Sequence, residues 1–217
     1  AELPYDVVSS AEARASAAGR PHSFFHISKP EIDLSEDVSL YDDSVYVRAQ
    51  ENFERFIEEG VLRPDDEPGL YLYTLVMGGR EQTGLVGCLD IDDYLSDRIK
   101  KHELTREDKE RDRMRHLDRL SAQIGLVFTF YREDGSGQPL FKRALQVVPE
   151  VDYIAADGVR HVLRRVRDRG LIDSFKALLE PLPLYIADGH HRAASAVKVG
   201  LEQRKANPNH TGEEEYN

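Results

Sequence analysis

Cysteine is almost absent from this sequence. Cys88 is the only cysteine among 217 residues, so no disulfide can form within the chain. A lone cysteine without a disulfide framework is typical of reducing compartments, and we therefore expect a cytoplasmic protein. Cys88 lies in an apolar stretch and is expected to be an inert thiol of the core.

Long apolar runs and a surplus of basic residues are also absent. No run approaches the roughly 20 apolar residues of a membrane span, so we expect no membrane partner. The chain has 29 Lys and Arg against 40 Asp and Glu, a formal net charge of -11. Proteins that coat duplex DNA depend on surplus Lys and Arg, so a nucleic-acid partner is not expected either.

One segment departs from this acidic balance. Basic residues gather between Arg98 and Arg119, interleaved with acidic ones. A local basic surface on an acidic protein would suit a small anionic ligand. A solvated helix with alternating charges explains the same pattern, and the sequence leaves both interpretations open.

Hydrophobic spacing and turn residues predict a mixture of helices and strands. A capping-box pattern at Ser9 and Glu12 begins a helix that ends near Gly19. Further helices are expected at 43–59, 105–122, 139–146, 171–179 and 192–204. Strands are expected at 70–76, 83–91, 126–131, 153–156, 161–166 and 184–187. The first two should form a hairpin around Gly78-Gly79, and the strand at 126–131 should be buried.

The strongest candidate site is the turn Asp188-Gly189-His190-His191-Arg192. A short apolar strand leads into it and a helix follows it. Gly189 permits a sharp turn and close approach to the backbone. The first N–H groups of the helix lack internal partners and, with the helix dipole, favour an anion.

The side chains of this turn suit the same ligand. Arg192 can bind phosphate through two charge-assisted hydrogen bonds. His190 and His191 can donate hydrogen bonds or transfer protons near neutral pH. We therefore predict that Asp188, Gly189, His190, His191 and Arg192 bind a phosphorylated small molecule.

Two simpler interpretations compete with phosphate binding. Asp188 could only cap the helix. Adjacent histidines sometimes bind a metal, but neighbours on a helix point about 100° apart, so one ion would use only His190 or His191. We expect no metal site.

Several segments together resemble a known family. They are Leu3–Ser9, Ser28–Glu31, Gly79–Gly84, Lys100–Thr105 and Tyr185–Ala196. On these motifs the chain resembles the large bacterial and archaeal domain-of-unknown-function family numbered one thousand and fifteen, over nearly its whole length. Members of that family are usually longer at both ends. Together with a start at Ala1 instead of Met, this leads us to expect a fragment of a longer protein.

The candidate turn is also similar to the Asp-Gly-His-His-Arg motif of the ParB/sulfiredoxin superfamily. That resemblance implies a compact α/β fold whose turn holds nucleotide phosphates. The free-serine kinases of the superfamily carry a His-Glu pair, a helix and a strand before the turn. His102-Glu103, the helix from Thr105 and the strand from Leu126 follow the same order here, with a longer insertion before Asp188. In those kinases the Glu is the proposed base, so the resemblance implies Glu103.

The leading hypothesis is a nucleotide-dependent phosphotransferase, a kinase acting on a small hydroxylated metabolite such as an amino acid. Its expected catalytic residues are Glu103, His102 and His191, with Glu103 activating an alcohol. Lys101 and Arg106 would join the turn in neutralising phosphate charge. ATP or ADP with Mg²⁺ is the expected cofactor.

Two other functions stay open. A non-catalytic module that senses a nucleotide or phosphate would use the same turn. A metal-dependent phosphoesterase or nuclease would use Asp188, His190 and His191, but the net charge disfavours it.

The expected architecture is a mixed α/β (α+β) fold. A ParB/sulfiredoxin-like core is predicted at residues 96–206, after an N-terminal helix-plus-hairpin region at 1–95. Residues 207–217 are predicted to form a flexible tail. A homodimer is compatible with the sequence, which does not set the oligomeric state.

Overall fold

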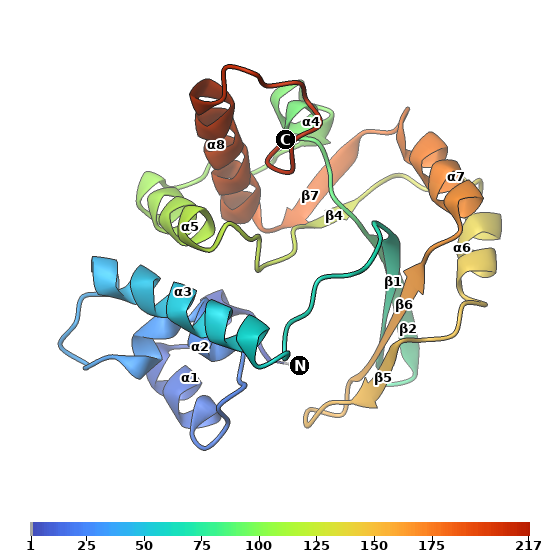
Figure 1. Cartoon of the computed structure of the whole chain (residues 1–217). Coiled ribbons are helices and arrows are strands. Elements are labelled where there is room, and N and C mark those ends of the chain that lie inside the picture. The colour runs from blue at the N-terminus through green and yellow to red at the C-terminus, as the bar shows by residue number, and fades with distance from the viewer. Residues whose placement is uncertain (1) are drawn as a thin grey trace. The chain divides into compact units, whose positions relative to one another are not determined.

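A computed structural model of the chain describes residues 2–217. These residues form eight α-helices and two β-sheets, which confirms the expected mixed α/β class (Figure 1). The chain divides into two compact units. Unit 1 comprises residues 1–64, 101–129 and 186–217, and unit 2 comprises residues 65–100 and 130–185. The units are interleaved along the chain, so they do not follow the division expected at residue 95.

The N-terminal part of unit 1 is helical. The capping box predicted at Ser9 and Glu12 is present, and the helix that it begins ends before Gly19, whose φ is +70°. Asp42 begins the longest of these helices, its side chain accepting a hydrogen bond of 2.9 Å from the N–H of Ser44. Between the two helices that the sequence predicts, the chain forms short helical turns, in a stretch whose apolar residues show no helical periodicity. The elements are η1 (Tyr5–Val7), α1 (Ser10–Ala17), α2 (Phe25–Ser28), η2 (Pro30–Asp33) and α3 (Asp43–Glu58).

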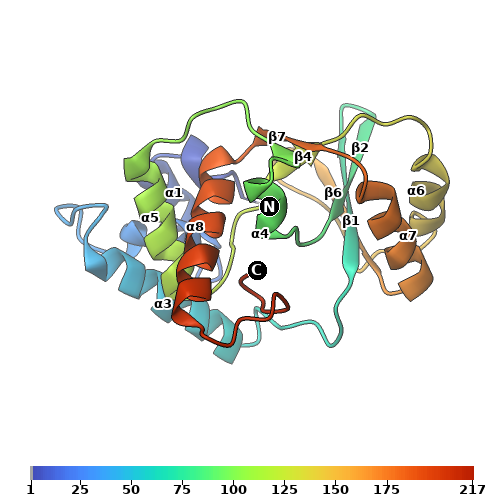
Figure 2. The same ribbon diagram turned by 90° about the horizontal axis from the view of Figure 1, so that it is seen from above.

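Two longer helices complete unit 1. Helix α5 (Glu107–Leu120) and helix α8 (His190–Ala206) lie side by side (Figures 1 and 2). Helix α5 also contacts α3. A cluster of buried apolar side chains joins α3 and α5 to α2, because each of these helices presents one apolar face to the others. The cluster contains Ile27, Ala49, Phe56 and Leu120.

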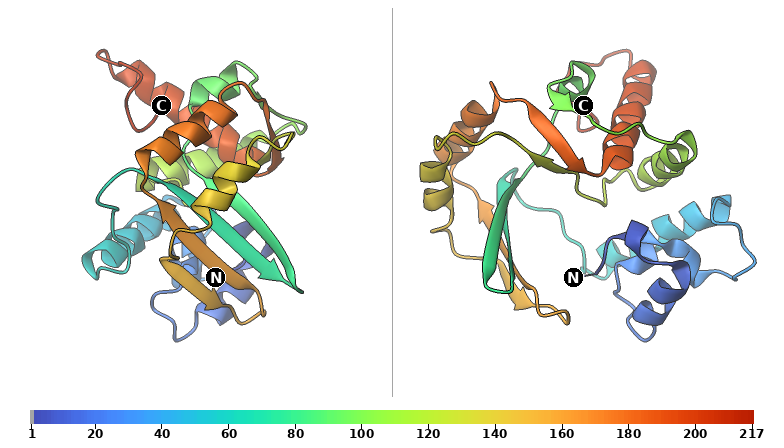
Figure 3. Two further views of the ribbon diagram at one scale, coloured as in Figure 1. Left: turned by 90° about the vertical axis from the view of Figure 1, so that its right-hand side faces the viewer. Right: turned by 180° about the vertical axis from the view of Figure 1, so that it is seen from behind.

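Unit 2 contains a four-stranded antiparallel sheet in the order β2-β1-β6-β5. The expected hairpin around Gly78-Gly79 is confirmed, with Met77 opposite Arg80. Helices α6 (Gln138–Ala144) and α7 (Arg169–Leu179) cover one face of the sheet (Figure 3). The strands are β1 (Leu70–Met77), β2 (Arg80–Val86), β5 (Val151–Ile154) and β6 (Arg160–Val166). The core between sheet and helices contains Leu72, Ala144, Val166, Leu171 and Phe175.

The second sheet has the order β3-β7-β4. Strand β3 (Ile99–Lys100) pairs in parallel with β7 (Leu184–Asp188), and β4 (Phe128–Phe130) lies on the other side. The prediction of a buried strand at 126–131 is wrong. Phe128 and Phe130 are each about half exposed, because β4 is an edge strand and both residues lie on the same face.

The expected strand at 83–91 is too long. It ends at Val86, and Asp90 then caps the short helix α4 (Ile91–Leu95), accepting a hydrogen bond of 2.8 Å from Asp92 N. Cys88 therefore lies in the connecting loop and is exposed, so the prediction of a core thiol is wrong. Among residues 2–217, no helix combines the length and apolar character needed to cross a membrane.

Residues 207–217 fold back on themselves through local hydrogen bonds. The Glu214 carboxylate accepts bonds of 2.8 and 2.9 Å from the N–H groups of Thr211 and Gly212. Burial alone would raise the pKa of Glu214, but these backbone donors lower it to about 2. Asn207 donates to the Tyr216 hydroxyl at 2.8 Å. The flexibility expected of this tail stays a prediction.

Candidate functional site

A pocket of about 540 Å³ lies within unit 1. Its walls come from segments far apart in the sequence. Four of the five segments that carry the family resemblance contribute to it, whereas Gly79–Gly84 forms the hairpin turn of unit 2. The contributing residues of these four segments are Tyr5, Asp6 and Val8, then Ser28–Glu31, then Glu103, then Ala187–Arg192.

The candidate turn forms the start of α8 at one wall of this pocket. Gly189 has a φ of +95° and is the N-cap residue, so the helix begins at His190, two residues before the predicted start. No side chain caps the helix, so the interpretation of Asp188 as a cap is wrong. The N–H groups of the first turn of α8 are thus left for another partner.

Arg192 folds back over the turn. Its Nη2 donates to Asp188 Oδ2 at 2.6 Å, and its Nη1 donates to the carbonyl oxygen of Leu126. A Cβ at Gly189 would lie 3.2 Å from the Arg192 guanidinium, so a side chain here would add a small shift of Arg192 to the strain of the positive φ. Asp6 Oδ2 lies 4.0 Å from Nη2. Arg192 therefore holds the turn and the loop at Leu126, and its predicted contact with phosphate stays a prediction.

His190 is the most buried side chain of the turn. It is 4% exposed, and its Nδ1 lies 3.6 Å from Glu103 Oε2. The ring of His102 meets it edge to face, with centroids 4.4 Å apart. Burial, followed by the neighbouring His102, lowers the pKa of His190. The structure thus brings together three residues of the predicted site: Glu103, His102 and His190.

His191 has a different neighbourhood. Its Nε2 accepts a hydrogen bond of 3.1 Å from the backbone N–H of Arg106, the N-cap residue of α5. The proton of a neutral ring must then be on Nδ1. The Arg106 side chain pairs with Asp108 at 2.7 Å and is largely exposed, although Arg106 also lines the pocket. Lys101 does not line it.

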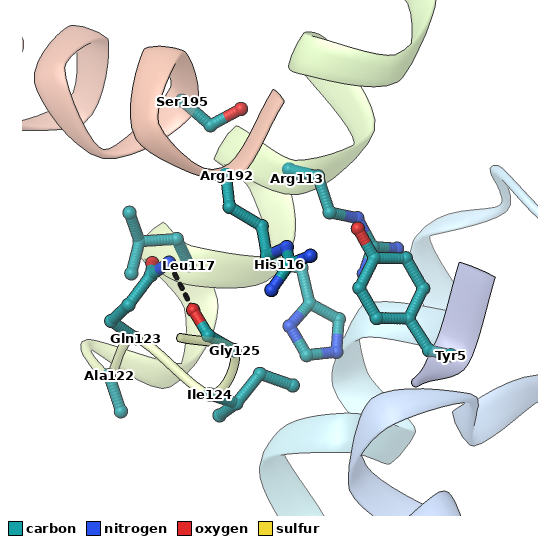
Figure 4. Close-up of a pocket in the computed structure, with 10 residues that line it drawn as sticks. All are labelled: Tyr5, Arg113, His116, Leu117, Ala122, Gln123, Ile124, Gly125, Arg192 and Ser195. Carbon is teal, nitrogen blue, oxygen red and sulfur yellow. Dashed lines mark hydrogen bonds between the residues drawn. The ribbon is translucent and has the colours of Figure 1, made fainter. Parts of the chain in front are cut away.

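The remaining wall of the pocket contains Tyr46, Asp112, Arg113 and His116, which the sequence does not point to. Arg113 packs its guanidinium over the Tyr5 ring at 4.3 Å and pairs with Asp112 at 2.5 Å. The Tyr46 hydroxyl donates to Asp112 at 2.7 Å, and burial, followed by that bond, raises the pKa of Tyr46. These contacts join η1, α3 and α5, and no local pattern marks them. His116 also lines the pocket. Figure 4 shows His116 near Tyr5 and Arg113 at a smaller neighbouring pocket of about 20 Å³, which Arg192 also lines.

A buried ion pair lies at the segment Ser28–Glu31. Lys29 Nζ is 3.1 Å from Glu31 Oε1, and both side chains are largely buried. Ser10 also donates to Glu31, at 2.6 Å. The family resemblance includes this segment, which has no role in the predicted site.

The basic residues between Arg98 and Arg119 are mostly neutralised. Those with close carboxylates include Arg98, Lys100, Arg106, Arg111, Arg113 and Arg115. Most of these pairs are exposed and local in sequence. The segment, which is helical from Glu107 onward, is therefore better described as a run of paired charges of alternating sign than as a basic surface.

A buried polar network fixes α5 against α8. Glu110, only 5% exposed, accepts hydrogen bonds from Lys198 of α8 and from Thr105. Burial would raise the pKa of Glu110, but these donors lower it overall. Ser195 donates to the Glu110 carbonyl oxygen at 3.1 Å. Because α5 and α8 carry opposite parts of the pocket, this network also sets the pocket's geometry.

Within residues 2–217, no group of three or more His, Cys, Asp or Glu side chains is arranged to hold a metal ion. Comparison with known families finds a match over residues 1–217 to a family described as "Protein of unknown function (DUF1015)". No curated protein and no solved structure matches the chain. Since the family match spans every residue and four of its motif segments line one pocket, the chain belongs to the DUF1015 family.

Proposed function

We propose that unit 1 is a nucleotide-dependent phosphotransferase that acts on a small hydroxylated metabolite. The observation that carries the proposal is the start of α8 in the pocket wall. There, the uncapped N–H groups of the first turn of α8 lie next to Gly189 and Arg192. His190 in the same turn contacts Glu103, which also lines the pocket. Phosphoryl transfer needs positioned phosphates, neutralised charge and an oriented nucleophile, and these groups are suited to supply them.

The pocket fits a nucleotide in size and in chemistry. Its volume of about 540 Å³ is within the usual range for small-molecule sites. The helix start would hold phosphate oxygens. Asp6 and Asp188, whose carboxylates flank the Arg192 guanidinium, would hold Mg²⁺ together with the phosphates. The metal would supply neutralisation of phosphate charge when bound.

Calorimetry with MgATP and MgADP tests binding, and phosphorus NMR with a panel of hydroxylated metabolites tests turnover. We expect binding of at least one nucleotide and transfer to at least one alcohol. Arg192→Ala should weaken binding about 10- to 100-fold, since hydrogen bonds to charged groups contribute roughly 1.5–3 kcal/mol. Arg111→Ala, on the exposed side of α5, is the matched control and should bind as the wild type does. Absence of nucleotide binding by the wild-type protein would exclude the proposed function.

A phosphate-sensing module without turnover is the second candidate, and the contacts of Arg192 favour it. A bound phosphate would compete with Asp188 for this guanidinium, which also holds the Leu126 carbonyl. Ligand binding could thereby alter the loop at Leu126. Turnover by the wild type separates the candidates. A kinase should transfer phosphate, and Glu103→Gln should reduce that turnover while nucleotide binding is kept, whereas a sensor should bind nucleotide and show no turnover in any form.

A further inference from the structure

One nitrogen of the site has no hydrogen-bond partner among residues 2–217. His190 Nε2 is buried and makes no hydrogen bond to any described residue. A ring nitrogen in this situation is costly, because it has lost water without gaining a replacement. His190 is among the residues that line the pocket, and because Nε2 itself is buried, a ligand would reach it only with a small movement of the ring.

The opposite nitrogen of the ring faces an acid. His190 Nδ1 lies 3.6 Å from Glu103 Oε2, which is ion-pair distance and longer than a hydrogen bond. Such contacts often tighten only when substrate binds. A carboxylate next to Nδ1 favours the tautomer with its proton there, which leaves a lone pair on Nε2.

We infer that His190 is the catalytic base of the proposed phosphotransferase and that Glu103 is a positioning residue which orients its ring. The inference rests on the proposed function and deepens it. As the substrate hydroxyl attacks, its proton moves to His190 Nε2 and its oxygen bonds to the terminal phosphorus of the nucleotide. The bond from that phosphorus to the bridging oxygen breaks, and the electron pair leaves with the nucleotide product. The imidazolium is stabilised by Glu103 and later returns its proton to water.

The surroundings favour imidazole over Glu103 as the proton acceptor. The Glu103 side chain is 57% exposed, so its carboxylate is hydrated by solvent, whereas the His190 ring is buried. The charged and titratable groups around His190 are His102, Glu103, Asp188 and His191. Burial, assisted by His102, lowers the pKa of His190, so the ring is neutral and can accept a proton at pH 7.

The dependence of kcat on pH identifies the base. In the wild type, a plot of kcat against pH should have a rising limb, because kcat increases as the base loses its proton. In His190→Gln the limb should disappear and kcat should fall about 10²- to 10⁴-fold, with nucleotide binding unchanged. In Glu103→Ala the limb should persist and move to lower pH, because the carboxylate raises the pKa of His190. His22→Gln, an exposed site in the same unit, is the control.

The nitrogen NMR spectrum gives a readout that does not depend on turnover or on a folded His190 variant. We expect the neutral His190 ring of the wild type to carry its proton on Nδ1, and that of Glu103→Ala to carry it mainly on Nε2. A wild-type proton on Nε2, or a limb that persists in His190→Gln and is lost in Glu103→Ala, would overturn the inference alone. A wild type that binds no nucleotide would overturn the proposed function together with it.

Discussion

At the scale of single residues, Gly189 combines two constraints that are separable. Its φ of +95° disfavours any side chain, and a Cβ would lie only 3.2 Å from the Arg192 guanidinium. Gly135 has nearly the same φ, +96°, but nothing lies near its Cβ position. A substitution at Gly135 therefore tests backbone strain alone, whereas a substitution at Gly189 tests the same strain together with the contact with Arg192.

We predict that Gly135→Ala costs about 1–2 kcal/mol of unfolding free energy, the usual cost of the left-handed conformation. Gly189→Ala should cost at least as much and should also weaken nucleotide binding, because the Cβ would shift the Arg192 guanidinium that contacts Asp188 and Leu126. Urea unfolding and calorimetry measure the two effects. Equal binding by both variants would contradict the role given to the Arg192 contact.

His116 makes stability depend on pH. Its ring is buried, its Nε2 donates to the Ile27 carbonyl at 2.9 Å, and burial lowers its pKa from 6.5 to about 4. Between these two values the unfolded chain binds the proton and the folded chain does not. Stability should therefore fall as the pH drops from about 6.5 to about 4, by roughly 3 kcal/mol in total.

The variant His116→Gln keeps a donor for Ile27 but does not titrate. Urea unfolding at pH 7 and pH 4.5 should show a steeper loss of stability in the wild type than in this variant. Carboxylates that titrate in the same range are common to both proteins and cancel in the comparison. Parallel losses would show that His116 does not contribute.

At the scale of elements, the contact between α5 and α8 depends on a carboxylate inside it. Lys198 and Thr105 hydrogen-bond to Glu110 and keep it ionised in the buried interface. Helix propensity alone would place neither helix against the other. The buried acid, which has a single cation from α8, selects one alignment of the two helices.

We expect Lys198→Met to reduce the unfolding free energy by about 1–3 kcal/mol, because it leaves a buried carboxylate without its cation. Arg111→Met, which removes the exposed pair with Glu107 on the same helix, should cost less than about 1 kcal/mol. Since the folded pKa of Glu110 is depressed, the contribution of Lys198 is present above the unfolded pKa of Glu110. It should vanish as the pH falls through the folded value. Chemical denaturation at several pH values checks this, and a pH-independent difference would count against it.

At the scale of the whole molecule, each unit has apolar clusters of its own, one in unit 2 and two in unit 1 among the described residues. Phe56 lies in one cluster of unit 1 and Phe175 in that of unit 2, both almost fully buried. All lining residues of the pocket belong to unit 1. Because the chain crosses between the units repeatedly, neither unit corresponds to a single segment that could be excised.

We predict that Phe175→Ala and Phe56→Ala each cost about 3–5 kcal/mol of stability. They should differ in their effect on the pocket. At temperatures where both variants stay folded, Phe175→Ala should bind nucleotide within about twofold of the wild type, a change of under about 0.5 kcal/mol. Phe56→Ala should bind less well. Loss of binding in a folded Phe175→Ala protein would mean that unit 2 contributes to the site.

The sequence by itself determined the elements whose signals are local. The capping box at Ser9, the hairpin around Gly78-Gly79 and the glycine turn at Gly189 each depend on a few neighbouring residues, so they could be predicted. The same is true of the mixed α/β class and of the family resemblance. The candidate turn and Glu103 could therefore be recognised from short motifs, although the predicted start of α8 is two residues late.

Only the tertiary structure decided which of these residues meet. The stacking of Tyr5 on Arg113 and the bond from the Arg106 N–H to His191 join residues about a hundred positions apart. The division of the chain into interleaved units likewise depends on which apolar faces pack together. Such contacts depend on burial between distant segments, which leaves no periodic pattern in either one. For the same reason, the buried and unpartnered Nε2 of His190, the most informative atom of the site, could not be predicted from the sequence.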